Sequence, residues 1–211
     1  MAEIEQNINR KSYLGYRKLK KLPRAFYLRP APNVAKDLLG KYLVRRIQGR
    51  VLTAQIVETE AYCENDPASH SFRGLTQRNE VMFWKGGHLY VYFTYGMHFC
   101  ANVVTGRAGK GEAVLLRAVQ PIDGIDIMSR NRKQRNRKTR RDLTNGPAKL
   151  CEALKIGRRE NGLDLLGDEI YLLDAPSLRP SAIETSTRIG IRVGETTKWR
   201  FFIKWNEWIS R

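Results

Sequence analysis

Apolar residues recur at alternate positions in several short stretches of this chain, and a period of two is typical of β-strands with one buried face. Gln48-Gly49-Arg50 separates the first two of these stretches and predicts a tight turn between them. Tyr95-Gly96-Met97-His98 separates the next two and predicts the tip of a second hairpin. The predicted strands are residues 41–47, 51–62, 88–94, 99–105, 112–119, 170–173, 188–193 and 200–205.

Helical signals are few by comparison. Residues 33–39 predict a short helix that is capped by Asn33 and ended by Gly40. Residues 148–155 predict another, with Pro147 in its first turn. Many strands and few helices indicate an α+β protein with a mixed, largely antiparallel, curved β-sheet, short flanking helices and a protruding β-hairpin.

Length and local composition predict one folded domain. The chain has 211 residues, which suits a single well-packed unit, and no internal repeat or linker divides it. Residues 1–22 are polar, basic from Arg10 onward, and end at Pro23, so we expect a flexible basic arm. The folded domain is expected to cover residues 23–211.

The strand predicted at residues 51–62 places acidic groups where core residues are expected. Leu52, Ala54 and Ile56 share one face by period-two alternation, and regular continuation puts Glu58, Glu60 and Tyr62 on that face. Carboxylates that extend an apolar row are rarely buried without a partner or a task. An ion pair with one of the many arginines remains the alternative for either glutamate.

The charge of the chain indicates an anionic partner. Lys and Arg number 38 against 21 Asp and Glu, which gives a formal net charge of +17. Such an excess favours polyphosphates, and nucleic acid is the obvious one. Eight of the twelve residues from Arg130 to Arg141 are basic and show no apolar period, so this segment is predicted to be a loop.

The chain lacks the sequence features of disulfide-rich, secreted, membrane-spanning and metal-binding proteins. Cys63, Cys100 and Cys151 are odd in number and far apart, which argues against a disulfide framework and fits a reducing compartment. The first residues have no apolar signal region and no run is long enough to cross a membrane, so we expect a cytoplasmic, nucleoid-associated protein in a bacterium or a nuclear one in a eukaryote. Metal-ligand spacings and glycine-rich phosphate loops are missing, so no metal or cofactor is expected.

The remaining side chains suit chemistry on a base attached to a sugar. A carboxylate can deprotonate a water that attacks a sugar carbon when the leaving group departs easily. Tyr62, His70 and Tyr92 could form an aromatic slot for a planar base, although each of them also suits ordinary core packing. Tyr95, at a predicted hairpin tip, is expected to be exposed, where it could wedge into a base stack.

The order of these residues resembles that in the alkyladenine DNA glycosylases, a family also called the 3-methyladenine or methylpurine DNA glycosylases. The resemblance covers roughly residues 24 to 208, nearly the whole chain. The segments that carry it are Arg24-Ala25-Phe26-Tyr27, Leu38-Leu39-Gly40, Ile56-Val57-Glu58-Thr59-Glu60-Ala61-Tyr62, Ala68-Ser69-His70-Ser71, Leu89-Tyr90-Val91-Tyr92 through Tyr95-Gly96-Met97, Ala113-Val114-Leu115-Leu116-Arg117-Ala118 and Asn145-Gly146-Pro147-Ala148-Lys149-Leu150.

The resemblance implies catalytic roles and a pocket. Glu60 would be the general base for the attacking water, which Arg117 and the backbone carbonyl of Ile189 would help to hold. The substrate-binding pocket around the flipped base would include Tyr62, His70 and Tyr92, and Asn102 would hinder the 2-amino group of guanine. The implied enzyme is a monomeric, monofunctional glycosylase that needs no metal and leaves an abasic site.

The resemblance also implies how the protein contacts duplex DNA that contains damaged purines. Tyr95 would fill the gap left by the flipped base, with Met97 and His98 beside it, and Lys149 would contact a phosphate. His98 departs from the pattern, because a tyrosine can occur there. Two other classes remain open: a noncatalytic RNA-binding or ribosome-associated protein, and a metal-dependent nuclease that uses Glu58 and Glu60.

Overall fold

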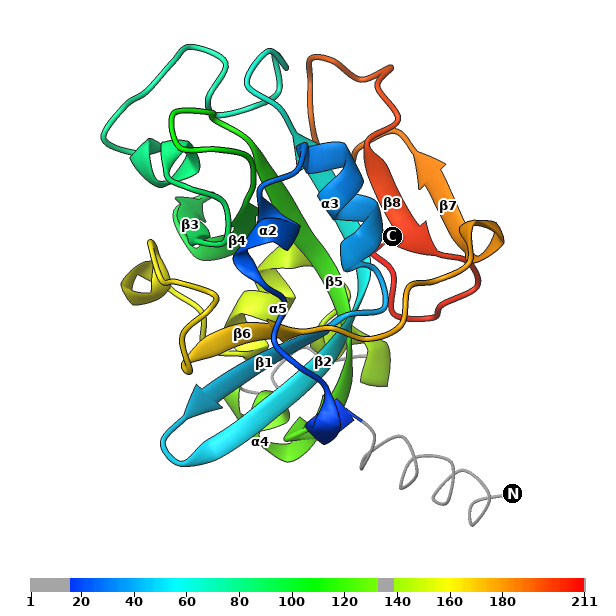
Figure 1. Cartoon of the computed structure of the whole chain (residues 1–211). Helices are drawn as coiled ribbons and strands as arrows, with labels where there is room; N and C mark the ends of the chain where they lie inside the picture. The colour runs from blue at the N-terminus through cyan, green and yellow to red at the C-terminus, as the bar shows by residue number, and fades with distance from the viewer. Residues whose placement is uncertain (1–15, 133–138, 211) are drawn as a thin grey trace.

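The computed structural model of the chain describes residues 16–132 and 139–210 (Figure 1). Its centre is an eight-stranded sheet with the order β3-β4-β5-β2-β1-β6, and β8 pairs with both β2 and β7. All strand pairs among the described residues are antiparallel. The strands are β1 Tyr42–Ile47, β2 Arg50–Tyr62, β3 Leu89–Thr94, β4 His98–Val104, β5 Ala113–Asp123, β6 Ile170–Leu173, β7 Ile183–Ser186 and β8 Arg200–Ile203.

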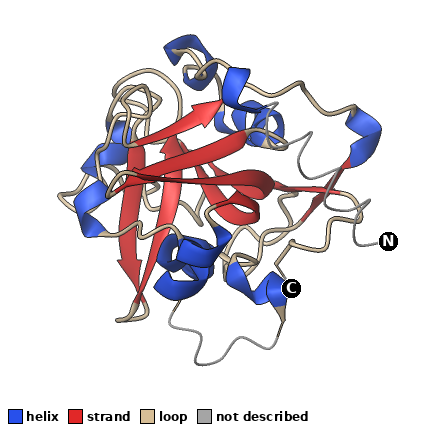
Figure 2. Ribbon diagram, turned by 90° about the horizontal axis from the view of Figure 1, so that it is seen from below, coloured by secondary structure: helices blue, strands red, loops and turns tan. Residues whose placement is uncertain are grey.

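Short helices flank the sheet, as Figure 2 shows from below. In Figure 1, α3 lies in front of β2 and α5 lies behind the strands. The α-helices are α2 Arg24–Tyr27, α3 Ala31–Leu38, α4 Ile125–Asn131 and α5 Pro147–Ala153, and the 3₁₀ turns are η1 Tyr16–Lys18, η2 Glu80–Phe83, η3 Arg140–Leu143, η4 Arg158–Glu160 and η5 Pro180–Ala182. This confirms the predicted α+β class and the single domain.

The main core fills the space between the sheet and these helices. Leu38 from α3, Ile56 from β2, Leu116 from β5 and Phe201 from β8 are all buried in it. Burying a side chain of this size contributes about 1.5–3 kcal/mol, so the strands that carry the core are firmly placed. The polar residues on β2 and β5 therefore project from a rigid support.

β2 is irregular at the point where its apolar row gives way to carboxylates. Its pairing with β5 changes register between Ile56 and Glu58 and again between Glu58 and Thr59. Bulges of this kind bend a strand, re-aim side chains and are enriched beside active sites. The regular continuation predicted from Ile56 is thus interrupted, yet Glu58 and Glu60 still approach the same arginine, Arg117.

Two predicted elements are wrong in position or kind. The helix predicted at residues 33–39 begins at Ala31, because Pro30 rather than Asn33 occupies the N-cap. The strand predicted at residues 188–193 is a loop, since Gly190 and Gly194 adopt positive φ angles and the preceding strand ends at Ser186. The strand predicted at 112–119 is confirmed and continues to Asp123.

The basic segment from Arg130 to Arg141 is only partly described. Its first residues belong to the end of α4, where Arg130 pairs with Asp126, and its last residues belong to η3. Arg132 pairs with Glu152 on α5. The prediction of a loop is therefore wrong at both ends, because ion pairs hold the first end and the Thr139–Asp142 capping box holds the second. Residues 133–138 lie outside the described part.

The last part of the predicted N-terminal arm packs on the domain. Tyr16 and Leu22 are buried, and the Tyr16 hydroxyl donates to Asp123 over 2.8 Å. Residues 1–15 lie outside the described residues, so the division into arm and domain at Pro23 stays a prediction.

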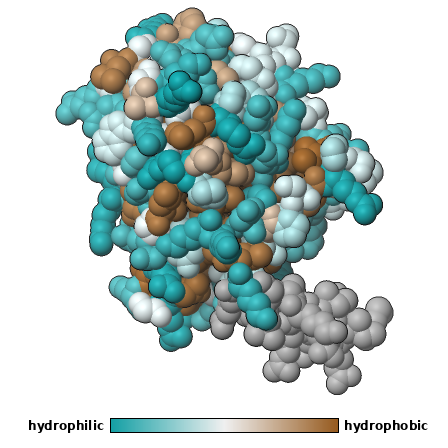
Figure 3. Space-filling model, viewed as in Figure 1, coloured by the Kyte–Doolittle hydropathy of each residue, from teal (hydrophilic) through white to brown (hydrophobic). Residues whose placement is uncertain are grey.

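The surface drawn in Figure 3 is mostly hydrophilic, with small separated hydrophobic patches. Among residues 16–132 and 139–210, none of the helices is long and apolar enough to cross a membrane.

Candidate active site

A cavity of about 640 Å³ opens among β2, β3, β4, β5 and the loop between β7 and β8. It gathers most of the residues that the sequence singles out for function. Tyr62, His70, Tyr92, Tyr95, Asn102, Arg117 and Ile189 line it. These side chains come from positions up to 127 residues apart in the chain, so the fold brings them together.

Glu60 lies beneath this cavity and is fully buried. Its Oε2 accepts a hydrogen bond from the Tyr62 hydroxyl at 2.9 Å, and its Oε1 accepts one from the Ile189 N–H at 2.8 Å. Nη1 of Arg117 is 3.3 Å from the same Oε1. An ionised carboxylate has about four lone-pair sites, so these three donors leave about one of them for a further donor.

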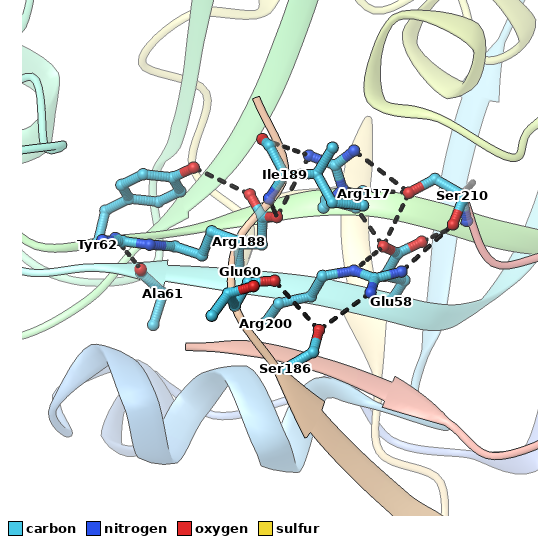
Figure 4. Close-up of polar contacts among 11 residues, drawn as sticks. Glu58, Glu60, Ala61, Tyr62, Arg117, Ser186, Arg188, Ile189, Arg200 and Ser210 are labelled. Atoms are coloured by element: carbon cyan, nitrogen blue, oxygen red, sulfur yellow. Dashed lines mark hydrogen bonds and ion pairs between the residues drawn. The ribbon is translucent and has the colours of Figure 1, made fainter. Parts of the chain in front are cut away.

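Arg117 links Glu60 to the loop between β7 and β8. Its Nη1 donates to the carbonyl oxygen of Ile189 over 3.5 Å, and Ile189 in turn donates its N–H to Glu60 (Figure 4). The guanidinium of Arg117 and the backbone of Ile189, both in the cavity wall, therefore meet the Glu60 carboxylate directly beneath it. Such a set can bind a water molecule and accept its proton.

Glu58 has a different environment, although it is equally buried. Its Oε1 accepts hydrogen bonds from Nε of Arg200 at 2.6 Å and from the Ser210 hydroxyl at 2.8 Å. Its Oε2 accepts the backbone N–H of Ser210 at 2.5 Å, and Nε of Arg117 is 3.3 Å from Oε1. Neither glutamate lines the cavity, but the hydrogen bonds of Glu58 come from Arg200 and Ser210, which do not line it either, whereas those of Glu60 come from Tyr62 and Ile189 of the cavity wall. Glu58 is therefore more poorly placed than Glu60 to act on a substrate.

A buried ion pair fixes the start of the loop that carries Ile189. Both terminal nitrogens of Arg188 donate to Asp66, and Nη1 also donates to the carbonyl of Ala61 at 3.0 Å. The guanidinium lies over the ring of Tyr62, 4.7 Å from its centroid. This pair therefore ties the loop to β2 and to one wall of the cavity.

Aromatic rings form a second wall. The rings of Tyr90 and Tyr92 have centroids 5.6 Å apart, and the His70 ring meets Tyr92 edge-on at 4.5 Å. Nδ1 of His70 is hydrogen-bonded to the Tyr90 hydroxyl at 2.9 Å. Asn102 lies on β4 opposite Tyr90 and donates to the Tyr90 carbonyl at 3.1 Å.

Burial sets the protonation states of this wall. It raises the pKa of Tyr90 to about 12 and raises the pKa values of Tyr62 and Tyr92 further, with the charge of Glu60 adding to the effect on Tyr62. Burial and then the charge of Arg78 lower the pKa of His70. The tyrosines are therefore protonated donors at neutral pH, and His70 is a neutral ring.

The β3–β4 hairpin presents exposed apolar side chains next to the cavity. Tyr95 is 82% exposed and Met97 is 69% exposed, and His98 is exposed beside them. Tyr95 has a positive φ of 49°, which an aromatic residue rarely adopts. This confirms the predicted exposure of Tyr95, while its action as a wedge stays a prediction.

Lys149 lies outside the cavity lining and is already engaged. Its Nζ donates to Asp142 at 3.0 Å and to Asn145 at 2.7 Å. The hydrogen bond from Lys149 contributes most to lowering the pKa of Asp142 to about 2. A phosphate that binds Lys149 would therefore have to compete with this carboxylate.

Four residues of the site escape prediction from sequence. Tyr90 alternates with Tyr92 on β3, so the strand pattern contained a signal for it. Asp66 and Arg188 are 122 residues apart, and no local pattern connects them. Ser210 belongs to a short segment after β8 whose sequence predicts no element at all.

Comparison with known proteins agrees with this arrangement. The sequence model described as "Methylpurine-DNA glycosylase (MPG)" matches residues 25–207. The chain belongs to the methylpurine-DNA glycosylase family. The protein is accordingly an enzyme of DNA repair, a DNA glycosylase, and its substrate is DNA.

Relatives from several organisms align with this chain over almost their whole length. A protein of Carboxydothermus hydrogenoformans is 51% identical over 191 residues, which covers 90% of this chain and 98% of the relative. One of Chlorobaculum tepidum is 45% identical over 92% of both chains, and one of Methanoculleus marisnigri is 46% identical over 90% of this chain and 98% of the relative. All three are named "Putative 3-methyladenine DNA glycosylase".

The described part of this glycosylase lacks a cluster of side chains that could hold a metal ion. Within residues 16–132 and 139–210, no three His, Cys, Asp or Glu side chains are grouped so as to hold a metal ion. Cys63, Cys100 and Cys151 are free thiols, and all three are buried.

Proposed function

We propose that this glycosylase flips damaged purines out of duplex DNA and hydrolyses the N-glycosidic bond with a water activated by Glu60. The observation that carries the proposal is the convergence of Glu60, Arg117 and the Ile189 carbonyl at the cavity wall. A water bound by the last two would present its proton to the free lone pair of Glu60.

The reaction balances with these groups alone. The water oxygen bonds to C1′ of the sugar, the bond from C1′ to the purine nitrogen breaks, and its electron pair leaves with the base. The water proton passes to Glu60, whose negative charge also opposes the positive charge that develops on the sugar. No amine attacks C1′ in this scheme, so the product is an abasic site in an intact strand.

The proposed base slot is the part of the cavity between Tyr62 and the wall of His70 and Tyr92. Stacking on such rings contributes about 1–3 kcal/mol per base, which offsets part of the cost of unstacking. Asn102 is 4% exposed and has its amide donor on the Tyr90 carbonyl, so it is a fixed obstacle to an extra amino group on the base. We propose that alkylated, deaminated and etheno purines are substrates, and that the enzyme works as a monomer.

An excision assay tests this function. Duplexes labelled at one end and carrying a single 3-methyladenine, 7-methylguanine, hypoxanthine or ethenoadenine are incubated with excess enzyme, with and without EDTA. Base release that leaves an alkali-labile site, with the strand intact before alkali and EDTA without effect, supports the proposal. Binding without release of any base, direct strand cleavage, or complete loss of release in EDTA would each overturn it.

A further inference from the structure

The Arg117 guanidinium has two edges with different partners. Nη1 forms one edge, where it lies 3.3 Å from Glu60 and 3.5 Å from the Ile189 carbonyl. Nε and Nη2 form the other edge, and both donate to the Ser210 hydroxyl at 3.2 Å. Because a guanidinium is planar and rigid, whatever fixes the second edge also fixes the position of Nη1.

Glu58 completes the second edge. It lies 3.3 Å from Nε of Arg117 and accepts three further hydrogen bonds, one from Arg200 and two from Ser210. Two carboxylates, Glu58 and Glu60, therefore balance two guanidinium groups, Arg117 and Arg200. Removing Glu58 would leave buried positive charge uncompensated beside the general base.

Ser210 is held in this place by the segment that follows β8. Trp208 is buried in the core, and Asn206 donates to Gln120 on β5 at 3.0 Å. The anchor is thus on the same strand as Arg117. Ser210 lies beyond residue 207, where the match to the family model ends, so family membership assigns it no role.

We propose that Ser210 and Glu58 are positioning residues that set the orientation of the Arg117 guanidinium for the proposed reaction. They act through Arg117 and touch no reacting atom. The two glutamates of β2 thus have separate duties, since Glu60 accepts the proton and Glu58 holds the arginine that places the water. This inference rests on the proposed function.

Ser210→Ala removes one hydroxyl that binds both Arg117 and Glu58. The single-turnover excision rate at saturating enzyme should fall about tenfold, which is less than the ~10²-fold that a misplacement of 1 Å can cost. Binding of the damaged duplex should be unchanged. Glu58→Gln, which keeps the side-chain shape but not the charge, should cause a loss of the same order and serves if Ser210→Ala folds poorly.

Thr59→Val is the matched control. Thr59 lies between the two glutamates, is fully buried and donates its hydroxyl to Ala35 of α3 on the opposite face of β2. Loss of this hydroxyl should leave the excision rate within about twofold of wild type. A tenfold loss in Thr59→Val as well would show a general effect of buried hydroxyls and would overturn the proposal.

A double-mutant cycle separates positioning from a merely structural role. Arg117→Lys keeps the positive charge but lacks the Nε and Nη2 groups that donate to Ser210. Ser210→Ala should therefore change the rate less than twofold in the Arg117→Lys background, although it costs about tenfold in the wild-type background. Equal factors in both backgrounds, or a wild-type rate for Ser210→Ala alone, would refute the positioning role.

The Nε–H signal of Arg117 in ¹⁵N NMR spectra tests the same contact without any reaction. It is assigned by its loss in Arg117→Lys, and it should exchange slowly with solvent in the wild type and fast in Ser210→Ala. An unchanged signal in Ser210→Ala would contradict the proposal. If the wild-type protein excised no base, the proposed function would fail, whereas this signal would still decide whether Ser210 holds Arg117.

Discussion

Arg188 carries its charge into the interior, where Asp66 accepts hydrogen bonds from both of its terminal nitrogens. Both side chains are almost completely buried. Breaking a buried pair by removing one partner costs about 3–5 kcal/mol, because the other charge stays buried. Asp66→Asn should therefore lower Tm by roughly 6–20 °C, at about 2–4 °C per kcal/mol for a domain of this size.

The same substitution in an exposed ion pair is the control for Asp66→Asn. Asp168 pairs with Lys21, but its side chain is 84% exposed, so Asp168→Asn should leave Tm nearly unchanged. Equal Tm values for the two variants would show that the ion pair of Arg188 with Asp66 does not stabilise the fold. Excision by Asp66→Asn should also fall, since Arg188 precedes Ile189 in the loop.

The protonation of His70 is open to a direct test. Burial and the charge of Arg78 lower its pKa, and the ring is hydrogen-bonded to Tyr90. Arg78→Ala removes one positive charge, so the protonated ring becomes less unfavourable and the pKa of His70 should rise toward the ordinary value of about 6.5. An NMR titration of the His70 ring measures the shift.

Arg73→Ala is the matched variant for this titration. Arg73 also lines the cavity, but its charge is not among the causes of the His70 shift. The Arg73→Ala substitution should leave the pKa of His70 unchanged. A rise of equal size in both variants would mean that the general positive charge of the cavity, and not Arg78, acts on His70.

The β3–β4 hairpin is the element whose proposed task is mechanical. Tyr95 is exposed at its tip with positive φ, a conformation that asparagine tolerates far better than an aromatic residue. Tyr95→Asn should therefore keep the turn and remove only the ring. It should weaken binding to a paired lesion more than it slows excision from a duplex already unpaired at the lesion.

Both duplexes are compared at equal salt, by equilibrium binding and by single-turnover excision. An equal loss on the paired and the unpaired lesion would contradict a wedge and would point to folding of the hairpin. Circular dichroism of Tyr95→Asn checks the fold independently.

Elements with a clear period could be predicted, and those shaped by tertiary contacts could not. The bounds of β2, β3 and β4 lie within one residue of those predicted from the alternation and the glycine turns, although bulges interrupt the alternation inside β2. The loop around Ile189 has apolar residues that mimic a strand, but its backbone bonds go to Glu60 and Arg117 instead of a neighbouring strand. α3 begins early because Pro30 and not Asn33 sets its start.

The site shows the same limit. Glu60 and Tyr62 stood out because a strand row ended in polar groups, and the resemblance supplied Arg117 and Ile189. Ser210, which holds Arg117, is 93 residues from it, and Asp66, which holds Arg188 next to Ile189, is 122 residues from Arg188, so neither spacing nor period predicts these contacts. Long-range ion pairs of this kind depend on the finished fold.

The net charge of +17 acts on the scale of the whole molecule. Arg130 and Arg132 pair with Asp126 and Glu152, whereas Lys133, Arg135, Arg137 and Lys138 lie outside the described residues, and from the sequence alone we expect these four to add to the charge that attracts DNA. Replacing these four by glutamine should weaken binding to damaged and undamaged DNA alike, because groups that bind phosphates carry no base information. The slope of log K against log salt should become shallower by about 0.9 for each phosphate that the variant no longer neutralises.

Saturated single-turnover excision by this fourfold variant should stay near the wild-type rate. The competing view is that the segment folds over the lesion and shapes the active site. A rate at least tenfold lower with an unchanged salt slope would favour that view.

The most direct test of the proposed mechanism is the single-turnover release of 3-methyladenine from a labelled duplex by Glu60→Gln. The amide fits the site, because the Tyr62 hydroxyl can accept from it, but it cannot take the proton of water. We predict that the variant binds the duplex like the wild type and loses at least about 10²-fold in rate, the size expected for a missing general base. Release at the wild-type rate by Glu60→Gln, above all if Glu58→Gln were inactive, would contradict this mechanism.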